Sequence, residues 1–142
     1  MQKIALIAYN GQLINLGGNM LALEGVRILD LSRLVPGAFC TMLLGDLGAD
    51  VLKIEAPDTT KFMGSARSLK EEENRKQVAY YAPDRNKRSV VLNLKSKVGR
   101  EIFYQLSRNA DIIVEGFRPG VAQRLGINYE TINKLNPKII YC

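Results

Sequence analysis

One motif of this sequence combines cations with hydrogen-bonding side chains and could therefore bind a ligand. Asn86, Lys87, Arg88 and Ser89 follow one another at the start of a strand-like run. A phosphate group needs fixed cations of this kind, because an anion is costly to remove from water without partners. The motif therefore indicates a site for a phosphate-bearing ligand. A polar loop with charges at a strand edge would explain the same residues without any ligand.

A second candidate site follows the apolar run 111–117, where Arg118 and Arg124 flank a turn and a short helix. If this run is a parallel strand, Phe117 and Arg118 come after its carboxyl end, where ligands of open α/β sheets bind. An ordinary connection between a strand and a helix explains the two arginines equally well. The alternatives stay open on the residues alone.

The basic residues concentrate in the middle of the chain. Residues 67–108 contain eleven basic and five acidic residues, whereas the remainder contains nine of each, so this stretch carries the whole net charge of +6. A local excess of this kind indicates an anionic partner, which could be a nucleic acid, a nucleotide-like cofactor or an acidic lipid. A solvated, lysine-rich face would give the same count.

Several classes of site are excluded by composition. The 142 residues include no histidine, which rules out histidine bases, Ser-His-Asp and Cys-His nucleophiles and histidine-ligated metals. Two cysteines, Cys40 and Cys142, are too few for a four-thiolate zinc site or a disulfide framework. We therefore expect no metal and a cytoplasmic location. No apolar run approaches the roughly 20 residues of a membrane span, so no membrane partner is expected.

The order of predicted elements is typical of an α/β fold with a mostly parallel sheet. Strand-like and helix-like patterns alternate from residue 22 onward, whereas residues 58–86 lack any sustained period and are predicted to form a long loop. The predicted strands are 26–32, 50–57, 89–94, 111–117 and 138–142, and the predicted helices are 36–48, 96–110, 120–126 and 129–136. The last strand has no helix after it, so we expect an incomplete sheet layer.

Apolar spacing predicts which helix faces are buried. In the first helix the stripe consists of Phe39, Met42, Leu43 and Leu47. In the second helix, which Ser96 is placed to cap, the apolar stripe consists of Val98, Ile102, Phe103 and Leu106.

Four blocks of the sequence resemble, in order and spacing, the N-terminal part of the family III CoA-transferases. This family includes formyl-CoA transferase, the carnitine CoA-transferases and α-methylacyl-CoA racemase. The blocks are LEGVRILDLSRLVPGAFCTMLLGDLGADVLKIEAP, NKRSVVLNLK, DIIVEGFRPGVAQRLGI and LNPKIIYC. The resemblance covers residues 22–142 and leaves residues 1–21 as an extension. It implies a Rossmann-like domain with helices on both faces of the sheet, and homodimers whose chains interlock like links.

The resemblance also implies a set of CoA contacts. They fall in the turn after the first strand, after the second strand, along the NKRS strand, and after the strand 111–115. Relatives vary at two of these positions, with arginine in some at Ala56 and asparagine in many at Gly116. The complete candidate set, with the two cations of the NKRS motif added, is Arg33, Leu34, Ala56, Lys87, Arg88, Leu92, Lys95, Gly116, Phe117 and Arg124.

In transferases of this family CoA passes between carboxylic acids through an aspartyl-CoA thioester. The resemblance thus implies coenzyme A or acyl-CoA and a carboxylic acid as substrates. In relatives the nucleophilic aspartate lies downstream of the position that matches Cys142, so no catalytic residue is assigned here and this chain alone is expected to be inactive. Two alternatives remain: an acyl-CoA racemase of the same family, and a non-catalytic basic module that binds nucleic acid. The poor aromatic interleaving of the basic stretch counts against the module, so we expect no nucleic-acid partner.

Overall fold

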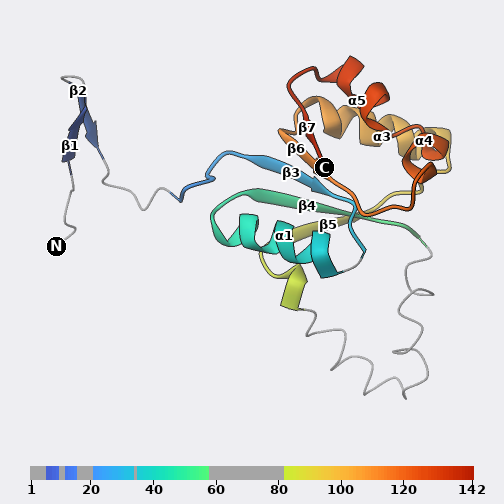
Figure 1. Ribbon diagram of the computed structural model, residues 1–142, viewed down its shortest axis with the longest axis horizontal. Helices are drawn as coiled ribbons and strands as arrows, with labels where there is room; N and C mark the ends of the chain where they lie inside the picture. The colour runs from blue at the N-terminus through green and yellow to red at the C-terminus, as the bar shows by residue number, and fades with distance from the viewer. Residues whose placement is uncertain (1–5, 10–11, 16–20, 34, 58–81) are drawn as a thin grey trace.

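The computed structural model describes residues 6–9, 12–15, 21–33, 35–57 and 82–142 (Figure 1). Leu34 and most of the loop expected at 58–86 lie outside these residues. Within residues 1–21, β1 (Leu6–Tyr9) pairs in antiparallel fashion with β2 (Gln12–Asn15). No helix in the described part of the chain is long and apolar enough to cross a membrane.

Five strands of the described residues form one parallel sheet. They are β3 (Arg27–Asp30), β4 (Asp50–Glu55), β5 (Lys87–Val91), β6 (Ile112–Val114) and β7 (Ile140–Tyr141). Their order across the sheet is β5-β4-β3-β6-β7. The chain thus starts in the middle of the sheet, builds outward in one direction, and returns to build in the other. This is the arrangement of a doubly wound sheet, with the change of direction between β3 and β6. The predicted α/β fold is confirmed.

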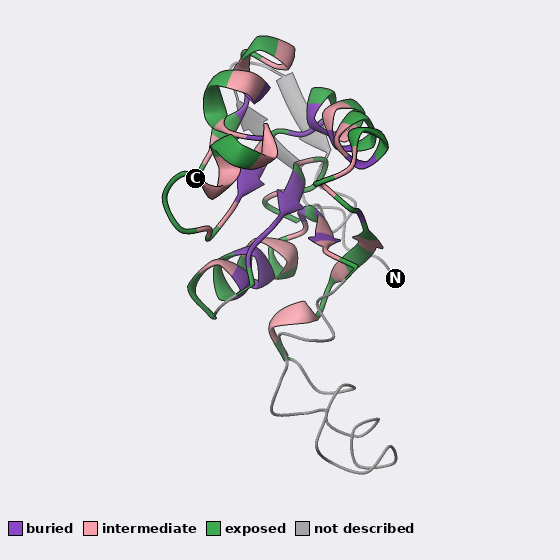
Figure 2. Ribbon diagram, turned by 90° about the vertical axis from the view of Figure 1, so that its right-hand side faces the viewer, coloured by how far each residue is buried: buried purple, intermediate pink, exposed green. Residues whose placement is uncertain are grey.

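Helices cover both faces of the sheet (Figure 1). On one face lies α1 (Val35–Asp46), with the short helix η3 (Ala82–Asp84) beside it. On the other lie α3 (Lys97–Arg108), α4 (Val121–Leu125) and α5 (Tyr129–Leu135). Figure 2 shows the buried residues on the strands and on the helix sides that face them. Under α3 and α5 the largest fully buried side chains are Phe103, Ile113, Ile127 and Ile132.

The predicted buried face of α1 is wrong at three of four positions. Met42 is buried, but the exposed fractions of Phe39, Leu43 and Leu47 are 48%, 45% and 49%. Helix α1 is apolar on nearly every side, so spacing alone could not show which face packs. The sheet instead contacts Ala38 and Thr41 together with Met42.

The stripe predicted for α3 is shifted by one position. Phe103 is fully buried, whereas Val98 and Ile102 are exposed. The buried row is Gly99, Phe103 and Ser107, and a Cβ atom at Gly99 would stand 2.1 Å from the carbonyl oxygen of Asn93. Only glycine permits this approach. The predicted cap is confirmed, since the Ser96 hydroxyl accepts the N–H of Gly99 at 3.0 Å.

Strand β5 begins two residues earlier than predicted and ends earlier. Lys87 and Arg88 belong to the strand, and Lys87 stands opposite Val51 of β4 in the register. In the sequence, the charged residues Lys87 and Arg88 are typical of a loop and not of a strand. The structure accommodates them because each is paired with a carboxylate from another element.

A titration at the sheet edge tests this packing. The Tyr141 hydroxyl donates to the carbonyl of Ile127 at 2.8 Å. Burial, with smaller contributions from the charges of Glu115 and Glu130, raises the pKa of Tyr141 to about 12. Because an exposed tyrosine has a pKa near 10, the folded state holds this proton more tightly than the unfolded state. The stabilisation is therefore complete below about pH 10 and is lost as the pH rises towards 12.

We predict that ultraviolet difference absorbance shows a tyrosine component that titrates well above pH 10, and that Tyr141→Phe removes this component. The free energy of unfolding of the unmodified chain should also fall more steeply above pH 10 than that of the variant. Titration of Tyr141 at the ordinary tyrosine pKa near 10 would contradict the packing described here.

Candidate functional site

A cavity of about 470 Å³ opens where the parallel strands end. Its walls come from the residues after β3, from the end of β4, from the segment after β5, from the turn after β6 and from α4. Such a position is where open α/β sheets bind ligands, because loops from adjacent strands diverge there. The lining residues are Leu31, Arg33, Ile54, Glu55, Ala56, Pro57, Leu92, Asn93, Leu94, Lys95, Phe117, Val121, Arg124 and Leu125.

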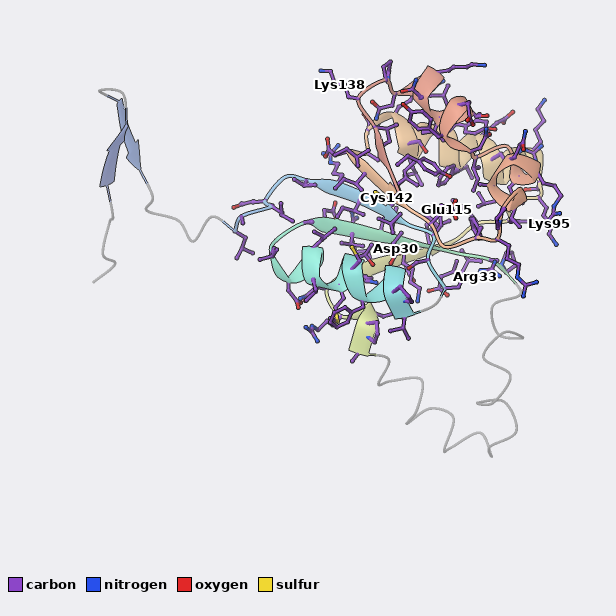
Figure 3. The ribbon with its side chains drawn as sticks, in the orientation of Figure 1. Asp30, Arg33, Lys95, Glu115, Lys138 and Cys142 are labelled. Carbon is purple, nitrogen blue, oxygen red and sulfur yellow. The ribbon has the colours of Figure 1, made fainter. Side chains whose placement is uncertain are left out.

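The cavity combines an apolar floor with a positively charged rim. Leu31, Ile54 and Leu92 are buried beneath it. The exposed side chains include three cations, Arg33, Lys95 and Arg124, whereas Glu55 is the single acidic residue among the described lining residues. Figure 3 shows Arg33 and Lys95 at the same end of the sheet. A ligand with anionic groups and an apolar or aromatic portion fits this distribution.

An aromatic ring and a guanidinium group meet at one wall of the cavity. The Arg33 guanidinium carbon lies 5.9 Å from the centroid of the Phe117 ring, a distance at which the cation is attracted to the ring face. The backbone N–H of Phe117 donates to the Glu115 carboxylate at 2.5 Å. The turn after β6 is thus braced at the residue whose ring faces the cavity.

The backbone of Lys95, which follows β5, is held by two hydrogen bonds. The Lys95 N–H donates to Oδ1 of Asn93 at 3.1 Å, and the Lys95 carbonyl accepts from Arg100 of α3 at 3.0 Å. No carboxylate among the described residues forms an ion pair with the side chain of Lys95 or with that of Arg124. The positive charges of these two side chains are therefore not neutralised within this part of the chain.

The structure brings six of the ten candidate residues to this cavity. They are Arg33, Ala56, Leu92, Lys95, Phe117 and Arg124. That they contact a ligand remains a prediction. Gly116 precedes Phe117 and is exposed, with open space where a side chain would stand. Leu34 lies outside the described residues.

Lys87 and Arg88 do not line this cavity, and that they contact a ligand remains a prediction. The Lys87 ammonium, 1% exposed, donates to Asp30 at 2.8 Å, to the Ala38 carbonyl at 2.9 Å and to Thr41 at 2.7 Å. Arg88 forms a surface ion pair with Asp50 at 2.6 Å. The physical reason is position along the strand: both residues stand at the start of β5, whereas the cavity lies beyond its end.

Sequence reasoning missed residues that share these strand ends. Glu55 precedes Ala56 and Asn93 follows Leu92, so their neighbours had already been singled out. Val121 and Leu125 stand on α4 with Arg124 at helical spacing, which was an available signal. For Asp30 the signal was a lone acidic residue inside an apolar strand. Among the described residues no group of three or more histidine, cysteine, aspartate or glutamate side chains could hold a metal ion.

Comparisons with known proteins agree on one family. The sequence model of CoA-transferase family III matches residues 23–142. The chain is 41% identical over 126 residues to an acyl-CoA transferase of Fusarium pseudograminearum. It is 42% identical over 127 residues to the succinyl-CoA:glutarate CoA-transferase of Mus musculus. These matches cover 84% and 87% of this chain but 28% of each relative.

Solved structures show the same fold. The crystal structure of Rv3272 from Mycobacterium tuberculosis superposes with a TM-score of 0.70 at 30% identity, over 85% of this chain and 32% of that protein. A CAIB/BAIF family protein from Brucella suis gives a TM-score of 0.67 at 28% identity, over 86% of this chain and 32% of that protein. The chain thus spans less than a third of the length of these relatives.

Two adjacent cations provide a matched test of the buried ion pair. Lys87→Met would leave Asp30, fully buried, without its counter-charge, and we predict that the free energy of unfolding falls by about 3–5 kcal/mol. Arg88→Met breaks an exposed pair and should change it by about 0–1 kcal/mol. Urea unfolding of both variants measures the difference. Equal effects would show that Lys87 is not buried as described.

Proposed function

Because this chain belongs to CoA-transferase family III, we propose that it carries the CoA-binding part of an enzyme that moves CoA between an acyl-CoA and a carboxylic acid. The observation that carries the proposal is the cavity at the strand ends. It gathers three cations around an apolar floor, at positions where the family resemblance implies CoA contacts.

The chemistry of CoA matches this distribution of charge. Coenzyme A is an adenine nucleotide with a 3′-phosphate and a pyrophosphate, joined to a pantetheine arm that contains methyl, hydroxyl and amide groups and ends in a thiol. Arg33, Lys95 and Arg124 would donate charge-assisted hydrogen bonds to the phosphates. The apolar floor and Phe117 would pack against the adenine or the arm. A volume of about 470 Å³ lies within the usual range of small-molecule sites.

The internal ion pairs favour CoA over nucleic acid. Within the basic stretch, Arg85 is paired with Asp46, Lys87 with Asp30 and Arg88 with Asp50. The hydrogen bond from Arg85 also holds the pKa of Asp46 below its ordinary value. These three cations are therefore compensated within the fold, which leaves a smaller surface excess for a nucleic-acid backbone to meet.

The activities of the relatives favour transfer over racemisation. The formyl-CoA:oxalate CoA-transferase of Streptomyces coelicolor is 40% identical over 120 residues, and the two relatives named above are also transferases.

The binding proposal predicts a specific loss of affinity. In the double variant Lys95→Ala and Arg124→Ala, the dissociation constant for CoA should rise roughly 30-fold, because each charge-assisted hydrogen bond contributes about 1 kcal/mol. Isothermal titration calorimetry on the 142-residue chain measures it. Arg108→Ala is the matched control, since Arg108 is exposed at the end of α3 and does not line the cavity.

An unchanged affinity in the double variant, or an equal loss in the control, would refute the placement of CoA in this cavity. A single-stranded oligonucleotide titrated over a series of salt concentrations tests the nucleic-acid alternative. Tight, salt-sensitive binding that CoA does not displace would favour that alternative over our proposal.

The proposed function also predicts that the 142-residue chain binds CoA without transferring it. Covalent catalysis needs a nucleophile within reach of the thioester carbonyl, and the single carboxylate among the described lining residues is Glu55, which does not match the family nucleophile. An acyl-CoA transfer assay followed by chromatography should detect no turnover, with an intact relative as positive control. Turnover at a rate comparable to that relative would refute this prediction.

A further inference from the structure

The carboxylate of Asp30 accepts hydrogen bonds from two directions. From the turn after β3, Ser32 donates its backbone N–H at 2.9 Å and its hydroxyl at 2.5 Å, both to Oδ1. From the side of α1, Thr41 Oγ1 lies 2.7 Å and Lys87 Nζ 2.8 Å from Oδ2. Oδ1 therefore accepts hydrogen bonds from the turn, and Oδ2 accepts them from helix α1 and from strand β5.

This cluster is sealed from solvent. Asp30 and Thr41 are fully buried, Ser32 is 4% exposed, and the Lys87 side chain is 1% exposed. The Lys87 ammonium also donates hydrogen bonds to the Ala38 carbonyl and the Thr41 hydroxyl. None of these four residues lines the cavity, so any effect on a ligand must pass through another residue.

The turn held by Asp30 leads directly to the cavity. Ser32 is drawn back towards the carboxylate, and α1 begins against it: a side chain at Gly37 would stand 2.5 Å from Cβ of Ser32. The next residue after Ser32 is Arg33, whose guanidinium lies over the Phe117 ring at the cavity wall. The path from the buried carboxylate to the cavity is thus Asp30, Ser32 and Arg33.

We propose that Asp30 is a positioning residue for the cavity: by holding Ser32, it sets the direction in which Arg33 leaves the turn. Lys87 supplies the counter-charge for this carboxylate, and it therefore acts on the cavity through Asp30, Ser32 and Arg33. The effect on ligand affinity rests on the proposed CoA site. The effect on Arg33 rests on the geometry alone.

Two variants each remove one hydroxyl that donates to the Asp30 carboxylate, and together they separate the effect on the turn from the effect on the helix. Ser32→Ala removes the hydroxyl on the turn side and keeps the Lys87–Asp30 ion pair. Thr41→Val removes the hydroxyl on the helix side and leaves the turn intact. Ser32→Ala loses one buried hydrogen bond, whereas Thr41→Val loses two, because Thr41 Oγ1 also accepts from Lys87. A merely structural role therefore predicts an effect of Thr41→Val at least as large as that of Ser32→Ala.

The first measurement needs no ligand. Nuclear Overhauser contacts between the Arg33 side chain and the Phe117 ring, recorded by NMR on the free chain, should weaken in Ser32→Ala and persist in Thr41→Val. The proposal is overturned if Ser32→Ala keeps these contacts, or if Thr41→Val loses them to the same extent. This result stands whether or not CoA binds.

The second measurement tests the consequence for affinity by calorimetry with CoA. Ser32→Ala should raise the dissociation constant roughly five- to tenfold, and Thr41→Val should leave it within about twofold. In an Arg33→Ala background the Ser32→Ala change should add nothing further, because both act through one group. Full additivity would overturn the pathway through Arg33. Absence of CoA binding in the unmodified chain would instead refute the proposed function, and with it the affinity consequence, while the NMR contacts still decide the positioning role.

Discussion

A negative charge buried inside the sheet constrains the rest of this fold. Asp30 has no access to water, so its carboxylate needs donors from the protein itself. It finds them on three elements: the turn after β3, helix α1 and strand β5. Lys87 must reach it across β4, which fixes the register of β5. Helix α1 must place Thr41 above it, which fixes the helix on the sheet. These placements satisfy one another and none is independent.

The cavity follows from the same register. Because Glu55 of β4 stands opposite Val91 of β5, the two strands end together, and residues 92–95 continue beside residues 56–57. The parallel pairing of β3 with β4 and β6 brings Arg33 and Phe117 to that same end. Residues at the ends of four strands, together with α4, thus meet around one volume.

The alternation of strands and helices was sufficient to predict the α/β fold, but not the strand ends, since β5 and β6 each end three residues before the predicted position. The candidate residues that line the cavity came mainly from the family resemblance. It was harder to predict which side of each helix faces the sheet and which charged side chains are buried. Helix α1 is apolar all round, so the side facing the sheet is decided by Thr41 meeting Asp30, a contact no periodicity reports. Lys87 and Arg88 look alike in the sequence, yet one is buried and the other exposed. Their difference depends on where the partner carboxylates Asp30 and Asp50 lie, which is a property of the assembled sheet.

The same distinction changes what the basic composition means. A net charge of +6 suggests an anionic partner, but charge counts do not separate cations that compensate internal carboxylates from cations that meet solvent. Arg85, Lys87 and Arg88, which precede or open β5, are paired within the fold. Lys95, beyond the end of β5, lines the cavity and has no carboxylate partner among the described residues. In the part of the basic stretch that the structure describes, the cations before and at the start of β5 are thus paired with carboxylates, whereas Lys95 after its end contributes charge to the cavity.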